Sequence, residues 1–458
     1  MPYNPFDKPI GEALTATDLQ LLISRSVSEG YFVEYKGQWL ANDKIAKSIA
    51  ALANTYGGWY FIGVEADKTH NVATNICGFN LTTCPDPIAT IREVAKSRIS
   101  PTPVFYPQVV DVAPGVVVAV VYVPGEQDTP FITSDGKIYR RIADCSNPEA
   151  ETNRYAVDRL YDQQKQHNKQ FRQFFQNSRT LTSRNKSGWL VCVLSPYPLG
   201  LIDKHSLIYP ENVEKLFLQS QQPIDLHVQE DINIGNATIN FTSLQPTNNS
   251  MMLRVVDPFN IAYNSLTLEL FADGSAKFVI PFVYSQSVLF LSEQSLEGLK
   301  SSITREALQR YLAKGASSDY SIDSLRFFDI GQLWSTAFVL LNFYLNWLEK
   351  DLSLVPEIQF AFRLQNIYHH VPFIDMDEWG NHVKRFSLPI LFSDTIQFPD
   401  EPYSRIIYPL ENKGRSLWSI FARDIGLACG LTGGLISAAI LNSLLGIHNI
   451  PSDWLTNQ

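Results

Sequence analysis

The stretch from Glu29 to Asp67 constrains the fold of this chain most, because it joins strand and helix patterns through a Gly-Gly pair. Polar and apolar residues alternate around Glu34 and Lys36, which places these two side chains on one face of a strand. Apolar residues recur at helical spacing over 45–53, and an aromatic and β-branched run fills 59–64. The first glycine of the pair suits the left-handed position that ends a helix. The stretch therefore predicts a strand, a helix, a tight turn and a second strand covered on both faces.

Acidic residues stand at the ends of these predicted strands. Magnesium and manganese ions prefer oxygen ligands, commonly two or three carboxylates together with a substrate phosphate. If the strands pair, their carboxylates converge, and Lys36 would stabilise charge that develops on a phosphate during phosphodiester cleavage. The candidate ligands of a Mg²⁺ or Mn²⁺ ion are Glu29, Glu34, Glu65 and Asp67. The alternative is that Glu34 and Lys36 form a solvated salt bridge worth about 0–1 kcal/mol.

Three pieces of this stretch carry a family resemblance. They are Glu-Tyr-Lys at 34–36, a helix that ends in Ala-Asn-Thr-Tyr-Gly-Gly at 53–58, and Phe-Ile-Gly-Val at 61–64 with an acid after it. This combination resembles the Schlafen-type AlbA-like domain, a family associated with DNA binding. Shorter motifs between residues 123 and 141 fit the same pattern, so the resemblance covers about the first third of the chain.

The resemblance implies nucleic-acid binding, to RNA or DNA, and for the nuclease members of the family a metal-dependent cleavage. Such cleavage would act on (t)RNA or single-stranded DNA in stress or phage defence, whereas other members bind without cutting. The catalytic residues it implies here are Glu29, Glu34, Lys36 and Asp67. The third acid stays open between two positions, since Glu65 directly follows the strand and Asp67 has the acid type that the family uses.

Composition and charge restrict the other function classes. The chain has 458 residues, enough for two or three domains, and its 45% hydrophobic and 18% charged residues are typical of a soluble globular protein. A net charge of −9 gives no global attraction to nucleic acid, so any such site must be a local patch. The five cysteines are odd in number and widely spaced, which indicates neither a disulfide framework nor a zinc finger. Together with a polar N-terminus, they predict a cytoplasmic protein.

The expected fold class is a multidomain α/β (α+β) protein. We predict an AlbA-like mixed sheet with helices over 1–160, a basic helical connector over 161–188, a β-rich domain over 189–300 and a mainly helical part over 301–458. An Asp-Gly pair at 273–274 predicts a hairpin turn in the β-rich domain. The strands expected in this domain lie at about 224–228, 237–241, 252–256, 266–271 and 276–283.

Basic residues define a candidate nucleic-acid surface. The window 163–202 contains no Asp or Glu, which is unusual in a net acidic chain. The cations that could follow a phosphate backbone are Arg92, Lys96, Arg140, Arg141, Lys165, Lys169 and Arg172. Three phenylalanines interleave with them, at 171, 174 and 175. These rings either offer stacking faces to bases or form the buried stripe of an amphipathic helix, and the sequence leaves both interpretations open.

The alternative function class is a non-catalytic interaction or sensor protein. In it the AlbA-like fold serves homodimerisation or ligand binding, and the C-terminal part binds a protein or a membrane. Residues 425–447 carry no charge and space small residues four apart, which favours a buried helix over a membrane span. Paired histidines at 369–370 near Asp375 and Asp377 have the chemistry of metal ligands, without the spacing of a known motif.

Overall fold

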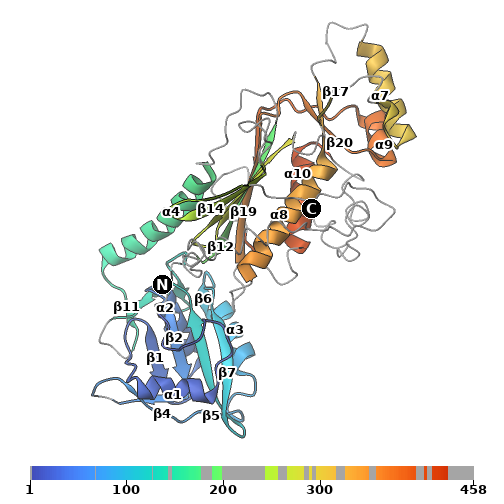
Figure 1. Cartoon of the computed structure of the whole chain (residues 1–458). Coiled ribbons are helices and arrows are strands. Elements are labelled where there is room, and N and C mark those ends of the chain that lie inside the picture. The colour runs from blue at the N-terminus through green and yellow to red at the C-terminus, as the bar shows by residue number, and fades with distance from the viewer. Residues whose placement is uncertain are drawn as a thin grey trace. The chain divides into compact units, whose positions relative to one another are not determined.

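A computed structural model describes most of the chain, in two compact units (Figure 1). The N-terminal unit comprises Met1–Gln173, Pro196–Asp203 and Asp351–Glu357, and the C-terminal unit comprises the remainder. The described residues are 3–67, 69–125, 127–142, 147–176, 188–198, 243–255, 266–282, 288–290, 296–315, 325–349, 357–398, 407–409 and 415–431.

A five-stranded mixed sheet forms the centre of the N-terminal unit. Strand β1 (Val33–Lys36) runs parallel to β2 (Gly58–Ile62), and β2 runs antiparallel to β8 (Val116–Val123). Strands β5 (Phe79–Asn80) and β7 (Tyr106–Ala113) also pair with β8 in antiparallel fashion. The very apolar β8 is thus the central strand, and the predicted mixed α/β sheet is confirmed.

Helices cover both faces of this sheet (Figure 1). Alternate residues of β2 point in opposite directions, as the pleat requires. Tyr60 and its neighbours on that face pack against α2 (Asn42–Ala53) and α3 (Pro87–Arg98). Trp59 and its neighbours on the other face pack against α1 (Ala16–Ser24). The run that contains β2 is continuously apolar because both of its faces are buried.

The two glycines between α2 and β2 have separate roles. Gly57 has a φ of +73°, and its N–H donates to the carbonyl oxygen of Leu52 at 2.9 Å, which ends the helix as expected. Gly58 has a φ of +137°, and a Cβ atom there would lie 2.2 Å from the carbonyl oxygen of Phe32. Only glycine therefore allows β2 to begin so close to the segment that leads into β1.

The strand expected over 59–64 is interrupted at Gly63. This residue has a φ of +106°, which ends β2 and turns the chain out of the central sheet. Strand β3 (Val64–Ala66) pairs with β4 (Ala73–Ile76) in a separate two-stranded sheet. Glu65 therefore belongs to a different sheet from Glu34, and Asp67 follows the end of β3.

Short strands and one long helix complete the described part of the N-terminal unit. An Asp135-Gly136 turn, in which Gly136 has a φ of +77°, precedes β10 as predicted. The remaining elements are β6 (Ile99–Ser100) with β9 (Ile132–Thr133), β10 (Tyr139–Arg140) with β11 (Glu149–Ala150), and α4 (Arg154–Gln176).

An eight-stranded sheet dominates the described part of the C-terminal unit. Its strand order is β13-β14-β15-β16-β12-β19-β21, with β22 also paired to β19. Strands from both sides of residue 300 share this sheet, so the last third of the chain contributes strands as well as helices. The strands are β12 (Trp189–Tyr197), β13 (Ser243–Pro246), β14 (Ser250–Val255), β15 (Leu266–Phe271), β16 (Ala276–Pro281), β19 (Glu357–Gln365), β21 (Thr395–Phe398) and β22 (Ile407–Pro409).

The predicted strands at 252–256, 266–271 and 276–283 correspond to β14, β15 and β16. The Asp-Gly pair turns the chain between the last two, with Gly274 at a φ of +82°. The strands expected at 224–228 and 237–241 lie outside the described residues. The other elements of this unit are β17 (Val288–Phe290), β18 (Arg326–Asp329), β20 (His370–Phe373), α7 (Ser302–Gly315), α8 (Ile330–Glu349), α9 (Asp377–Phe386) and α10 (Arg415–Ala428).

The second of the small residues spaced four apart after 425 lies just beyond the end of a helix, not within it. Helix α10 ends at Ala428, and Gly430 follows with a φ of +75°. The N–H groups of Gly430 and Leu431 donate to carbonyl oxygens of the last helical turn, both at 2.9 Å, as in a glycine-terminated helix. Residues 432–447 of this stretch lie outside the described part of the chain. None of the described helices is long and apolar enough to cross a membrane.

Candidate functional site

The first strand directs the predicted site residues into the fold. Val33 and Tyr35 of β1 point into the core beneath α1. Because side chains alternate along a strand, Glu34 and Lys36 point to the opposite face, toward α2. Glu34 has no exposed surface, so its carboxylate lies within the protein rather than on a groove.

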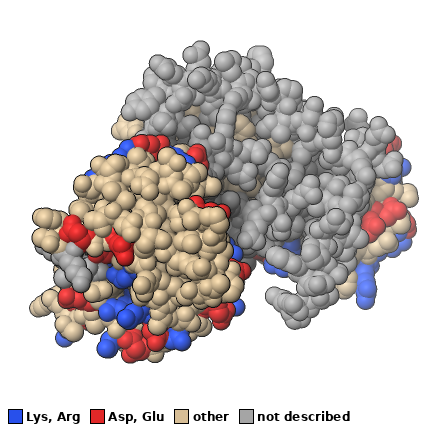
Figure 2. Space-filling model, turned by 90° about the horizontal axis from the view of Figure 1, so that it is seen from below, with Lys and Arg blue, Asp and Glu red and all other residues tan. Residues whose placement is uncertain are grey.

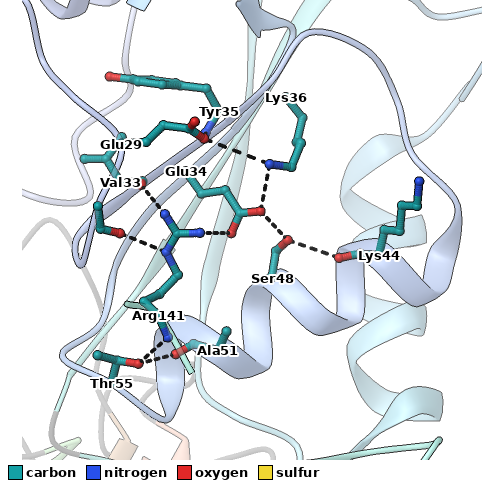
Figure 3. Close-up of polar contacts among 11 residues, drawn as sticks. Glu29, Val33, Glu34, Tyr35, Lys36, Lys44, Ser48, Ala51, Thr55 and Arg141 are labelled. Carbon is teal, nitrogen blue, oxygen red and sulfur yellow. Dashed lines mark hydrogen bonds and ion pairs between the residues drawn. The ribbon is translucent and has the colours of Figure 1, made fainter. Parts of the chain in front are cut away.

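Arg141 is the main partner of this carboxylate (Figure 3). Its Nη1 lies 3.1 Å from Oε2 of Glu34, and both side chains are fully buried. Its Nε donates to the carbonyl oxygen of Gly30 at 2.8 Å, and its Nη2 donates to that of Val33 at 3.0 Å. Its backbone N–H donates to Oγ1 of Thr55 at 2.9 Å. Arg141 therefore ties the segment before β1, through its guanidinium, to the end of α2, through its backbone N–H. Because the guanidinium is fully buried, the prediction that it contacts a phosphate backbone is wrong.

The second oxygen of Glu34 is also occupied (Figure 3). The Lys36 ammonium lies 3.1 Å from Oε1, and the Ser48 hydroxyl donates to the same oxygen at 2.8 Å. Ser48 belongs to α2 and is itself buried. Both carboxylate oxygens thus have cationic partners, and the solvated salt bridge considered from the sequence is in fact a buried network.

Glu29 joins the edge of this network. Its Oε1 accepts the backbone N–H of Tyr35 at 2.7 Å and lies 3.9 Å from the Lys36 ammonium. Only 6% of its side chain is exposed. Burial raises the pKa of Glu29, while the Tyr35 N–H and the Lys36 charge oppose that shift. The structure thus brings Glu29, Glu34 and Lys36 together, as the sequence predicts.

Glu65 and Asp67 have other partners. Glu65 lies on β3 with an exposed side chain and accepts the Asn75 side-chain amide at 3.1 Å. Asp67 accepts the backbone N–H groups of Thr69 and His70 at 2.6 and 2.5 Å, and these bonds, that from His70 foremost, lower its pKa. The turn at Gly63 separates these two carboxylates from the buried cluster.

This arrangement does not fit a Mg²⁺ or Mn²⁺ site. Such an ion needs several oxygen ligands around one point. Within the described ranges, no group of three or more His, Cys, Asp or Glu side chains is placed to hold a metal ion. The carboxylate of Glu34, the proposed central ligand, already has Arg141, Lys36 and Ser48 as partners.

The residues near the paired histidines also serve the fold. His370 is buried, with its ring 5.9 Å from that of Phe282, and burial lowers its pKa. The Asp375 carboxylate accepts the backbone N–H groups of Lys300 and Ser301, at 2.8 and 3.1 Å. Asp375 therefore holds the segment that leads into α7.

The remaining predicted cations differ in exposure. Arg92 and Lys96 are exposed and one turn apart on α3. Arg140 instead pairs with Glu151 at 2.9 Å. Figure 2 shows Lys and Arg interspersed with Asp and Glu over the described surface in view. Of these cations, Arg92 and Lys96 are thus the better placed to meet a phosphate group.

Helix α4 carries the rest of the predicted basic surface. Lys165 and Lys169 are exposed, and Lys165 lies 3.2 Å from Asp162; the side chain of Arg172 lies outside the described residues. Phe171 is buried, and the Phe174 ring packs edge-on against Phe271 at 4.8 Å. Phe171 and Phe174 therefore pack within the protein, as in the buried stripe of an amphipathic helix, rather than offering stacking faces to bases.

Sequence reasoning missed an exposed aromatic cluster on the N-terminal unit. It consists of Tyr3, Tyr31, Phe32 and Tyr56, whose exposed fractions run from 36% to 52%. The rings of Tyr3 and Phe32 stack at 5.3 Å, and Tyr56 lies 5.6 Å from Tyr31 and 5.9 Å from Phe32. The available signal was that aromatic residues flank both the start of β1 and the Gly-Gly turn.

Comparison with known proteins gives one family match. Residues 29–150 match the family model described as Schlafen, AlbA_2. No protein of curated function matches the chain.

Two solved structures are similar over part of the chain. The DIP2311 protein from Corynebacterium diphtheriae is 22% identical, with a TM-score of 0.19, and the match covers 29% of this chain and 27% of that protein. The N-terminal domain of a RecG-related protein from Nitrosomonas europaea is 23% identical, with a TM-score of 0.21. That match covers 31% of this chain and 97% of the domain.

Proposed function

Because residues 29–150 form a Schlafen AlbA-like domain, we propose that the N-terminal unit binds nucleic acid and that its buried charges position the binding surface. The observation that carries this proposal is the exposed aromatic cluster of Tyr3, Tyr31, Phe32 and Tyr56. Aromatic side chains stack on unpaired bases with little dependence on sequence, at about 1–3 kcal/mol per base. The proposed ligand is therefore single-stranded RNA or DNA, whose base faces are accessible.

The buried network supports this surface from below. The Arg141 guanidinium donates hydrogen bonds to the carbonyl oxygens of Gly30 and Val33, the residues directly before Tyr31 and after Phe32. Its own backbone N–H bonds to the side chain of Thr55, the residue before Tyr56. Arg141 thus holds two of the three segments that carry the exposed rings, one through its guanidinium and one through its backbone N–H. Rings held in place lose less conformational entropy on binding, which strengthens the interaction.

Exposed cations supply the electrostatic part of the proposal. Arg92 and Lys96 lie one turn apart on α3, so they face the same side of the helix. Contacts of such side chains with phosphates release counterions, so binding should weaken as salt rises. The net charge of −9 makes this attraction local.

The test is fluorescence anisotropy of the full chain with labelled single-stranded RNA, single-stranded DNA and duplex DNA at two salt concentrations. We expect tighter binding of the single strands and weaker binding at the higher salt. Y56A should weaken single-strand binding about tenfold, the equivalent of about 1.4 kcal/mol. The matched control is Y155A, since Tyr155 is 85% exposed on α4 and lies outside the cluster. Equal binding by Y56A and the wild type, or binding that ignores salt, would refute the proposal.

Metal-dependent cleavage is the second candidate function, favoured by the convergence of Glu29, Glu34 and Lys36. A role in defence would depend on such cleavage. Its test is incubation of the full chain with RNA or single-stranded DNA and Mg²⁺ or Mn²⁺, where cleavage is the outcome that supports this candidate. Cleavage that E29Q abolishes while binding persists would establish the enzyme instead.

A further inference from the structure

The C-terminal unit contains a cavity that is independent of the surface discussed above. It lies over the face of strands β13 to β16, beside the last turn of α4, and has a volume of about 620 Å³. This size falls within the usual range of small-molecule sites, about 300–1,000 Å³. The cavity is lined by polar and aromatic side chains together, which distinguishes it from a packing void.

Strand register gathers the charged side chains on this face. Glu269 of β15 lies directly opposite Lys277 of β16 and, on its other side, opposite Met252 of β14. Directly opposite residues of antiparallel strands project to the same face. Arg254 lies two positions after Met252, so it projects to that face as well. Three charged residues from three neighbouring strands thus line one cavity.

The charges in this cavity favour an anion. Among the described residues that line it, the charged ones are two cations, Arg254 and Lys277, and one carboxylate, Glu269. The carboxylate accepts the Ser250 hydroxyl at 2.7 Å, which holds it against the sheet. The described lining therefore carries a local positive excess in a chain of net charge −9. Lys277 is only 7% exposed, and a charge so far from bulk solvent interacts strongly with a ligand of opposite sign.

Two aromatic side chains line the cavity beside these charged residues. Phe174, from the last turn of α4, lines the cavity and has the Lys277 ammonium 5.1 Å from its ring centre. Trp189, at the start of β12, lines it too. Trp189 is itself buried and packs in a small core cluster with Val191 and Val279, which holds this side chain on the sheet. Such rings favour a flat, unsaturated group through stacking and edge contacts.

We propose that this cavity binds a small molecule that carries a phosphate or carboxylate group on a planar ring system. Arg254 and Lys277 bind the anionic group, and Phe174 and Trp189 contact the ring. The Glu269 carboxylate, which accepts the Ser250 hydroxyl, faces the same space. It disfavours a ligand with a second negative charge near this carboxylate.

The test is isothermal titration calorimetry of the full chain with two probes, AMP for the phosphate class and indole-3-acetate for the carboxylate class. We expect one of them to bind, and its uncharged analogue, adenosine or indole, to bind at least tenfold more weakly. Ribose 5-phosphate or acetate, which lack the ring, should be weaker by a similar factor. The identity of the probe that binds distinguishes the two anion sources.

Variants assign the binding to this cavity. K277M, with R254M as the second variant, should weaken binding at least tenfold, whereas E269Q should leave it unchanged or tighten it, because it removes a like charge. K300M is the matched control, since Lys300 is exposed in the same unit and does not line the cavity. The proposal is overturned if neither probe binds at millimolar concentration. It is also overturned if ring-free or uncharged analogues bind equally well, or if K277M and R254M both bind like the wild type.

Discussion

Each unit of this protein has a group of charged side chains on one face of a sheet. One group is buried within the protein, and the other lines a cavity. In the N-terminal unit, Glu34 and Arg141 are fully buried, and both oxygens of the Glu34 carboxylate have partners within the protein. In the C-terminal unit, Arg254, Glu269 and Lys277 line a cavity of about 620 Å³. The same residue types therefore build a support in one unit and a candidate binding site in the other.

The neighbouring helix accounts for this difference. Helix α2 packs closely onto its sheet through alanines and larger aliphatic side chains, and Ser48 reaches the carboxylate directly. Beside the C-terminal sheet, the large Phe174 side chain stands on Phe271 and leaves open space next to the charged strands. Whether a charged cluster can take a ligand thus depends on what packs above it, rather than on which charges it contains.

The largest expected effect comes from removing the buried cation of the N-terminal unit. R141M leaves the Glu34 carboxylate buried without its guanidinium partner, and such a loss typically costs about 3–5 kcal/mol of unfolding free energy. Urea denaturation followed by circular dichroism measures it. The control is R92M, because Arg92 is exposed, and a change within about 0.5 kcal/mol is expected there. A similar small change for R141M would contradict a supporting role for the pair.

A smaller effect should follow from the matched change in the C-terminal unit. K277M removes a cation that faces Glu269, but the carboxylate keeps its hydrogen bond from the Ser250 hydroxyl, so we expect a cost of about 1 kcal/mol. The same denaturation experiment measures it. If K277M destabilised the protein as much as R141M, the cavity cluster would be a support as well, and the comparison between the units would fail.

The smallest expected effect concerns pH. Because burial raises the pKa of Glu29, the folded state binds its proton more tightly than the unfolded state does. The stability from this proton is present at low pH and is lost as pH rises from the usual value of 4.5 through the raised pKa. E29Q should flatten this part of the stability profile while changing stability at pH 7 by less than about 1 kcal/mol. Denaturation at a series of pH values checks it, and an unchanged slope in E29Q would exclude Glu29 as the source.

The local patterns of the sequence predicted the N-terminal fold well. Helical spacing, a left-handed glycine and two-residue alternation each depend on neighbours in the chain, and α2, Gly57 and the Glu34–Lys36 face follow them. The position of Arg141 could not be predicted in this way. It meets Glu34 across 107 residues, and a basic residue beside a strand end looks the same in the sequence whether it is buried or exposed.

The sequence by itself determined the order of strands and helices around Glu34 and the direction in which that side chain points, because pleat and helix periodicity are local properties. Only the tertiary structure decided what those residues meet. A turn at Gly63 took Glu65 to another sheet and Asp67 beyond its end, and a distant arginine filled the space beside Glu34. In the C-terminal unit, the pairing of three strands placed Arg254, Glu269 and Lys277 around one cavity. Contacts between segments far apart in the chain depend on packing, and no local pattern encodes them.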